Sequence, residues 1–272
     1  MKMQKKTRRE ISFDFGGSFS DLVIFEGGQV AETFHYPRAE FDPLDMENWL
    51  DGKKFDRLIT VGGNQAKVPS QINRQKVHKT NEIEAIGAGG LYLSKLDKAL
   101  VTSIGTGVCF VSAQKNKFTH LGGTAIGGGT ILGLGKVMLN ANSLDEIYRL
   151  ALRGNSQKIN LSVNDIVGSK IGLLPPWVPA SYFAKVTEQK KVKKDDLAAG
   201  IFSLCAGSIA SSLIFAARSL NFSVVVLGGR LSQNKLIRDE IKKIAKLFKI
   251  KVVTLAKAEI MTAVGAWFLR QG

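Results

Sequence analysis

The sequence is poor in the residues from which many functional sites are built. Its 272 residues include only two cysteines and three histidines. Cys109 and Cys205 are too few and too far apart for a disulfide framework, and the scattered histidines form no zinc-binding pattern. No Gly-x-Ser-x-Gly elbow with a suitable histidine after it is present, which argues against serine hydrolase chemistry. We therefore expect a protein of a reducing, cytoplasmic compartment.

Long apolar runs are also scarce. The basic start, Met1 to Arg9, is followed by Glu10 and Asp14 instead of the apolar run of a signal peptide, so secretion is not expected. Residues 197–217 carry no charge and are numerous enough to span a bilayer. Serine, glycine and alanine dilute this run, so it predicts a helix buried inside a protein that has no membrane partner.

The sequence is rich in positive charge, and it has enough apolar residues to form a buried core. It is 44% hydrophobic, and 38 Lys and Arg against 23 Asp and Glu give a net charge of +15. Such a charge attracts nucleotides, nucleic acid or acidic lipid, and it does not choose among them. The lysines do not alternate with the aromatic residues that stack on bases, so we expect no nucleic-acid partner and keep a nucleic-acid binder only as a third hypothesis.

Two similar glycine turns lie about ninety residues apart. Short apolar runs at 11–14 and 22–25 flank the first turn, and runs at 100–104 and 108–112 flank the second turn, Gly105-Thr106-Gly107. Each arrangement predicts a strand, a tight turn and a returning strand. The repeated construction indicates two lobes that each begin with a hairpin.

The remaining pattern alternates strands with helices, which indicates an α/β architecture. Ser143 and Glu146 have the spacing of a capping box, and Asp195 or Asp196 could cap the long apolar helix. The expected elements are a strand at 58–61, a helix at 82–96, a helix at 143–152, the long helix, a strand at 223–227, a helix at 234–248, a strand at 251–255 and a helix at 260–269.

The glycine turns could bind phosphate. A turn with glycine at its tip and Ser or Thr beside it leaves main-chain N–H groups free to point at an anion. Asp14 ends the strand before Gly16-Gly17-Ser18, where a Mg²⁺ ion that bridges phosphates would need an oxygen ligand. No Walker A motif is present, because Gly135-Lys136 is followed by valine, and no spacing matches the dinucleotide fingerprint. Each turn alone fits an ordinary hairpin better, and it is the pair together with the glycine-rich segment that favours phosphate binding.

The order of these motifs resembles the sugar kinase, heat-shock and actin superfamily, and more narrowly the type II pantothenate kinases. The most specific segment is Gly122 to Leu134, which is rich in glycine. The other segments that carry the resemblance are Asp14 to Ser18, Gly62-Gly63-Asn64, Glu82 to Glu84, Ser103 to Val108, Pro175 to Phe183 and Gly228-Gly229-Arg230. The resemblance implies a two-lobed ribonuclease H-like (actin-like ATPase) α/β fold with a central nucleotide cleft, with lobes at 1–96 and 97–272.

The resemblance also implies transfer of the γ-phosphate of ATP to the primary hydroxyl of pantothenate, the first step toward coenzyme A, by a protein that is commonly a homodimer. Asp14 would position Mg²⁺ and the attacked phosphate, and Glu82 would be the catalytic base. On its own, Glu82 fits better as an acidic residue in the first turn of a helix, and only the surrounding motifs favour the catalytic role. The other implied ligands of ATP are Gly16, Gly17 and Ser18 around the β and γ phosphates, Gly105, Thr106 and Gly107 in the second turn, Gly127, Gly128 and Gly129 along the cleft, and Gly228 and Gly229 near the adenosine.

Two departures leave the acceptor open. His120 lies near the position of an arginine in the family, and Asp21 stands where bacterial relatives often have a lysine. Arg74, Lys76 and Lys79 could supply the missing charge, although a solvated basic loop explains them more simply. Two alternatives therefore remain: a kinase of a related alcohol such as pantetheine or an amino sugar, and a nucleotide or coenzyme A sensor without catalysis.

Overall fold

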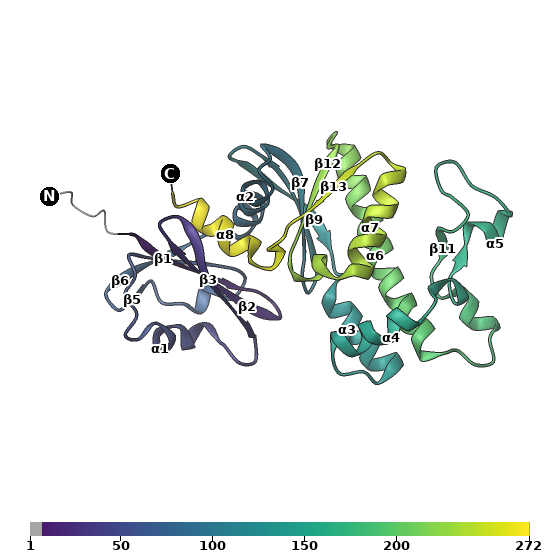
Figure 1. Cartoon of the computed structure of the whole chain (residues 1–272), viewed down its shortest axis with the longest axis horizontal. Helices are drawn as coiled ribbons and strands as arrows, with labels where there is room; N and C mark the ends of the chain where they lie inside the picture. Colours follow the sequence, from purple (N-terminus) through teal and green to yellow (C-terminus); the bar gives the residue numbers. More distant parts are fainter. Residues whose placement is uncertain (1–6, 272) are drawn as a thin grey trace.

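The computed structural model describes residues 7–271, which form two mixed β-sheets with helices packed against them (Figure 1). The first sheet has the spatial order β3-β2-β1-β4-β6-β5 and the second has the order β13-β12-β7-β8-β9. The strands are β1 (Arg9–Phe15), β2 (Phe19–Glu26), β3 (Gln29–Pro37), β4 (Arg57–Val61), β5 (Gln71–Ile72), β6 (Gln75–Lys79), β7 (Lys98–Ile104), β8 (Val108–Gln114), β9 (Lys117–Thr124), β12 (Val224–Gly228) and β13 (Lys251–Thr254).

Both sheets are built in the same way. In the first, β1, β2 and β3 pair antiparallel, and β4 and then β6 continue the sheet in parallel beside β1. In the second, β7, β8 and β9 pair antiparallel, and β12 and then β13 continue in parallel beside β7. This repeat confirms that each half begins with a hairpin, and it places the turn after β1 and the turn after β7 at equivalent edges.

Two helices, α2 (Glu82–Ser94) and α8 (Met261–Phe268), lie between the sheets. Buried side chains of α8 pack with those of β2 and β4, whereas α2 packs mainly on the second sheet. The helices cross at Gly265, where a Cβ atom would lie 1.8 Å from the carbonyl oxygen of Ala85, so only glycine permits this contact. The predicted lobe boundary after residue 96 falls between α2 and β7, and the chain returns to the first sheet with α8.

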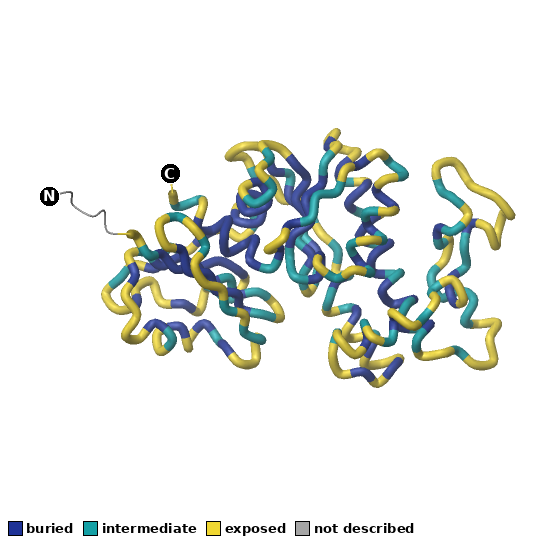
Figure 2. Tube along the Cα trace, in the orientation of Figure 1, coloured by how far each residue is buried: buried dark blue, intermediate teal, exposed yellow. Residues whose placement is uncertain are grey.

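On the other face of the second sheet, α6 (Lys194–Ser219) and α7 (Lys235–Leu247) pack against the strands, and α3 (Gly128–Leu139) and α4 (Leu144–Arg153) pack against α6. Within the described chain, α6 is the one helix long and apolar enough to cross a membrane, and 61% of its apolar window is buried in the protein. Dark blue positions run along α6 in Figure 2, as expected for a core helix.

Residues 155–193 form an arm that lies beyond α6 and α7, far from the first sheet, and most of its positions are exposed or half-buried (Figures 1 and 2). It contains β10 (Leu161–Ser162), α5 (Val163–Val167) and β11 (Pro179–Ser181), and β10 pairs with β11. The remaining elements are α1 (Met46–Leu50) and six 3₁₀ turns, η1 (Pro43–Asp45), η2 (Gln65–Lys67), η3 (Ser156–Lys158), η4 (Ala184–Glu188), η5 (Arg230–Gln233) and η6 (Ala258–Ile260).

Two predicted helix caps are wrong in detail. Asp195 and Asp196 lie inside the first turn of α6, where Arg153 donates to the Asp195 carboxylate and the main chain of Asn155 donates to Asp196. The hydroxyl of Ser143 accepts from the N–H of Glu146 as expected. The Glu146 carboxylate, however, accepts from the N–H of the preceding Asn142, so the capping box is not closed.

Candidate active site

The two glycine turns touch each other. Gly16 to Ser18 connects β1 to β2, and Gly105 to Gly107 connects β7 to β8. The hydroxyl oxygens of Ser18 and Thr106 lie 2.7 Å apart in a hydrogen bond that joins positions 88 residues apart in sequence. A Cβ atom on Gly17 would lie 3.0 Å from the same Thr106 hydroxyl. The structure therefore brings the two turns together, and any group that enters between them must separate these hydroxyls.

The turns present free hydrogen-bond donors. Among the described residues, the N–H groups of Gly16, Gly17, Ser18, Thr106 and Gly107 donate no turn or loop hydrogen bond. Consecutive free N–H groups at a bend form a concave anion site. The N–H of Gly105 differs, because it donates to the carbonyl of Gly107 and holds the second turn in shape.

The glycine-rich segment supports the second turn instead of offering all its donors to a ligand. The N–H groups of Gly128 and Gly129, at the start of α3, donate to the carbonyls of Gly105 and Thr106. A Cβ atom on Gly127 would lie 2.6 Å from the Thr106 carbonyl oxygen and 2.9 Å from the Cα of Gly107. The close approach of these two backbones explains the requirement for glycine at 127.

Asp14 lies at the end of β1, half-buried, directly opposite Asp21 of β2. Burial, and then the nearby carboxylates of Asp21 and Glu82, raise the pKa of Asp14 well above its usual value, while a hydrogen bond with Thr262 opposes the shift. A bound divalent cation would reverse this effect by favouring the ionised form.

The acidic residues do not form a preassembled metal cage. Among the described residues, no three His, Cys, Asp or Glu side chains are arranged to hold a metal ion. Mg²⁺ usually retains several waters and takes one or two carboxylates together with substrate phosphates. The residues present therefore fit a metal that arrives with a triphosphate and takes Asp14 as its protein ligand.

Glu82 is the first residue of α2, and the side chain of Asn81 caps this helix by accepting from the N–H groups of Ile83 and Glu84. Glu82 is exposed to solvent, and partial desolvation of its carboxyl group raises the pKa of Glu82. Glu82 also contributes to the raised pKa values of Asp14 and Cys109, which places the three groups around one region. A carboxyl group with a raised pKa is a better proton acceptor.

Asp21 makes a contact between the two halves that the sequence did not predict. Its buried carboxylate accepts from Arg230, with 2.5 Å between Oδ1 and a terminal guanidinium nitrogen, and lies 2.6 Å from Nδ1 of His35. Burial raises the pKa of the Asp21 carboxyl, although Arg230 and then His35 oppose the shift. The only signals in the sequence were an aspartate at an unexpected position and an arginine after two glycines.

Gly228 and Gly229 lie beside the second turn. Gly229 has a φ of +78°, and a Cβ atom there would lie 2.5 Å from the carbonyl oxygen of Ile104, the last residue of β7. The same turn directs Arg230 toward the first sheet. By contrast, His120, Arg74, Lys76 and Lys79 are exposed on strands or turns, as a solvated basic surface requires.

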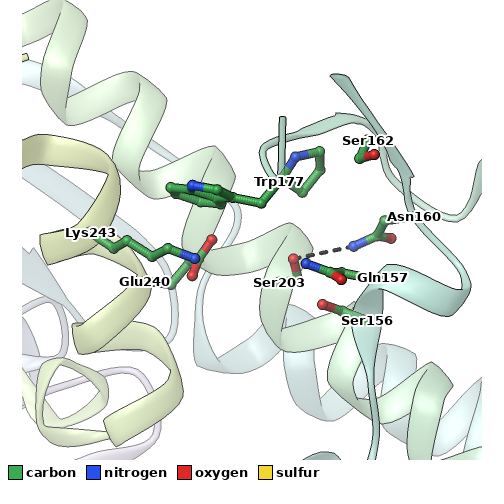
Figure 3. Close-up of a pocket in the computed structure, with 9 residues that line it drawn as sticks. Ser156, Gln157, Asn160, Ser162, Trp177, Ser203, Glu240 and Lys243 are labelled. Carbon is green, nitrogen blue, oxygen red and sulfur yellow. Dashed lines mark hydrogen bonds between the residues drawn. The ribbon is translucent and has the colours of Figure 1, made fainter. Parts of the chain in front are cut away.

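A small cavity lies elsewhere, between the arm and helices α6 and α7 (Figure 3). Trp177 covers it, Lys243 lies over the Trp177 ring, and Asn160 donates to Ser203 across its floor. Its volume of about 80 Å³ is well below the roughly 300–1,000 Å³ typical of small-molecule sites. None of the predicted phosphate-binding or catalytic residues lines it.

Comparison with known proteins supports a kinase fold. The profile of the Fumble family matches residues 95–266, more than half of the chain. A type II pantothenate kinase of Bacillus cereus (strain G9842) is 27% identical over 237 residues, which cover 83% of this chain and 85% of the relative. The same kind of protein from strain AH820 is 27% identical and covers 94% of this chain and 95% of the relative.

Solved structures share the fold at lower identity. A ROK family glucokinase from Streptomyces griseus, solved with glucose and AMPPNP, aligns with a TM-score of 0.63 and 16% identity over 97% of this chain and 100% of its own. The activator of 2-hydroxyisocaproyl-CoA dehydratase from Clostridium difficile, with bound ADPNP, aligns with a TM-score of 0.62 and 15% identity over 95% of this chain and 92% of its own. These neighbours confirm the predicted actin-like ATPase fold class.

Proposed function

Because the chain belongs to the Fumble family, we propose that it is an ATP-dependent kinase that phosphorylates the primary hydroxyl of pantothenate. The observation that carries this proposal is the contact between the turns at Ser18 and Thr106, with Asp14 at the base of the first turn. The free N–H groups of both turns would hold the β and γ phosphates of one nucleotide. Asp14 would hold Mg²⁺, which supplies positive charge to the phosphates when bound.

Glu82 would act on the acceptor. Its carboxylate would orient the hydroxyl and accept its proton while the oxygen forms a bond to the γ-phosphorus and the bond to the β–γ bridging oxygen breaks. Most of the acceleration would come from in-line positioning and charge neutralisation. The raised pKa of Glu82 suits this role, because it increases the proton affinity of the carboxylate.

A substrate panel tests the function. Purified protein with Mg²⁺ and ATP should release ADP with pantothenate, and less with pantetheine or an amino sugar. Glu82→Gln should lower kcat by about 10²- to 10⁴-fold without loss of ATP binding, whereas Glu84→Gln, two residues along the same helix and exposed, should change it little. Turnover of another alcohol alone would reject pantothenate, and ATP binding without any turnover would identify a sensor.

We also propose a cytoplasmic homodimer. Large apolar side chains remain exposed on the surface, among them Val137 on α3, at 84% exposure, and Phe215 on α6, at 72%. A second copy that covers such side chains would remove apolar surface from water. Light scattering at micromolar concentration should give twice the 29.6 kDa chain mass, and a stable mass of one chain would contradict the dimer.

A further inference from the structure

We propose that Arg230 is a phosphate-binding residue, which reaches from the second half of the chain to the terminal phosphates of the nucleotide. The inference deepens the proposed function and rests on it, because it assumes that ATP binds between the two turns. It adds a side-chain cation to a site otherwise built from main-chain donors and carboxylates.

The position of Arg230 carries the argument. It directly follows Gly229, which packs against Ile104 at the start of the second turn. Its guanidinium group lies over the ring of Phe19, with 4.3 Å between the central carbon and the ring centroid. Phe19 is the residue after Ser18, so Arg230 contacts elements adjoining both turns.

The guanidinium group of Arg230 has N–H donors that are not used in hydrogen bonds within the described chain. An arginine side chain carries five N–H donors in a planar fork. The described contacts of Arg230 use one terminal nitrogen, which lies 2.5 Å from Asp21 and 3.4 Å from His35. Within the described chain, its Nε and other terminal nitrogen have no hydrogen-bond partner, and the side chain is 37% exposed. The free edge can therefore receive phosphate oxygens in the two-pronged geometry that arginine favours.

The surrounding charge creates a need for such a cation. Three carboxyl groups lie around the turns, because Asp14 interacts electrostatically with both Asp21 and Glu82. A triphosphate adds further negative charge, which would be repelled without a compensating positive group. Asp21 acts as a positioning residue here, because its ion pair and the Phe19 ring together fix the plane of the guanidinium group.

The test compares nucleotide with nucleoside. We expect Arg230→Gln to weaken ATP binding by about 10- to 100-fold, as for a lost hydrogen bond between charged groups, and to change adenosine binding less than twofold. Arg230→Lys should weaken ATP binding to an intermediate degree, since it keeps the charge and loses the fork. Arg238→Gln is the matched control, because Arg238 pairs with Asp239 on α7, and it should leave ATP binding unchanged.

Calorimetric titration, with a melting curve for each variant, separates the outcomes. Unchanged ATP affinity in Arg230→Gln, or an equal loss of ATP and adenosine binding, would overturn the inference and reduce Arg230 to an ion pair between the two halves. If Arg230→Gln does not fold, full ATP affinity in Arg230→Lys would overturn it instead. A wild-type protein that binds no ATP would refute the proposed function itself, whereas wild-type binding with no Arg230 effect refutes only this inference.

Discussion

Replacing Gly127 by alanine tests whether the glycine-rich segment maintains the second phosphate turn. The added methyl group would lie 2.6 Å from the Thr106 carbonyl oxygen, 2.9 Å from the Gly107 Cα and 3.0 Å from the Gly105 carbonyl oxygen. All three atoms belong to the main chain, so no side chain can rotate to make room. The second turn must therefore move away from the start of α3.

The expected magnitude follows from overpacking. Inserting a methyl group into a well-packed site costs about 1–3 kcal/mol, and each kcal/mol lowers the melting temperature of a domain of this size by about 2–4 °C. Gly133→Ala is the matched control, because Gly133 lies inside α3, the helix that Gly127 precedes, and a Cβ atom there meets nothing within 4 Å. That change should stabilise the protein by about 0.5–1 kcal/mol, the difference in helix propensity between the two residues.

Thermal unfolding and ATP titration of both variants give the answer. Gly127→Ala should melt at a lower temperature and lose ATP affinity, and Gly133→Ala should melt at the same or a higher temperature with normal affinity. Wild-type stability and affinity in Gly127→Ala would refute the reasoning, because they would mean that the two backbones are not in close contact.

Two further predictions concern ionisable groups. Because the folded-state pKa of Asp14 is raised, the free energy of unfolding falls as the pH rises from the ordinary aspartate pKa of 3.8 to the raised value. Asp14→Asn removes this loss, so it should increase the melting temperature at neutral pH. The same substitution should abolish Mg²⁺-dependent turnover. An unchanged or lower melting temperature would contradict the assigned environment. For Glu82, kcat/KM should rise with pH through a pKa above the 4.5 of an ordinary glutamate. An acid limb at or below that value would show that Glu82 is not the base.

The local parts of this fold could be predicted from sequence because their signals lie within a few residues. Strands around Gly105 to Gly107 and the start of α2 at Glu82 match the structure closely. Alternation of apolar residues and turn glycines determines such elements largely by local preference. The family resemblance supplied the fold class, which composition and periodicity alone narrowed only to α/β.

The rest depends on contacts between distant residues. The residues of strand β3 are all exposed or half-buried, so its pairing with β2 leaves little periodic signal in the sequence. The ion pair of Asp21 with Arg230 joins positions 209 residues apart. Likewise, Asp195 has the residue type of a helix cap, but Arg153 binds it inside the helix. Such tertiary contacts override the local preferences from which secondary structure is predicted.

The central claim is that the two turns hold one triphosphate between them. A crystal structure with Mg²⁺ and a non-hydrolysable ATP analogue tests this most directly. The account predicts β and γ phosphates between Gly16 to Ser18 and Gly105 to Gly107, with the Ser18 and Thr106 hydroxyls parted and the metal on Asp14. A nucleotide bound away from both turns, with the hydrogen bond between Ser18 and Thr106 intact, would contradict it.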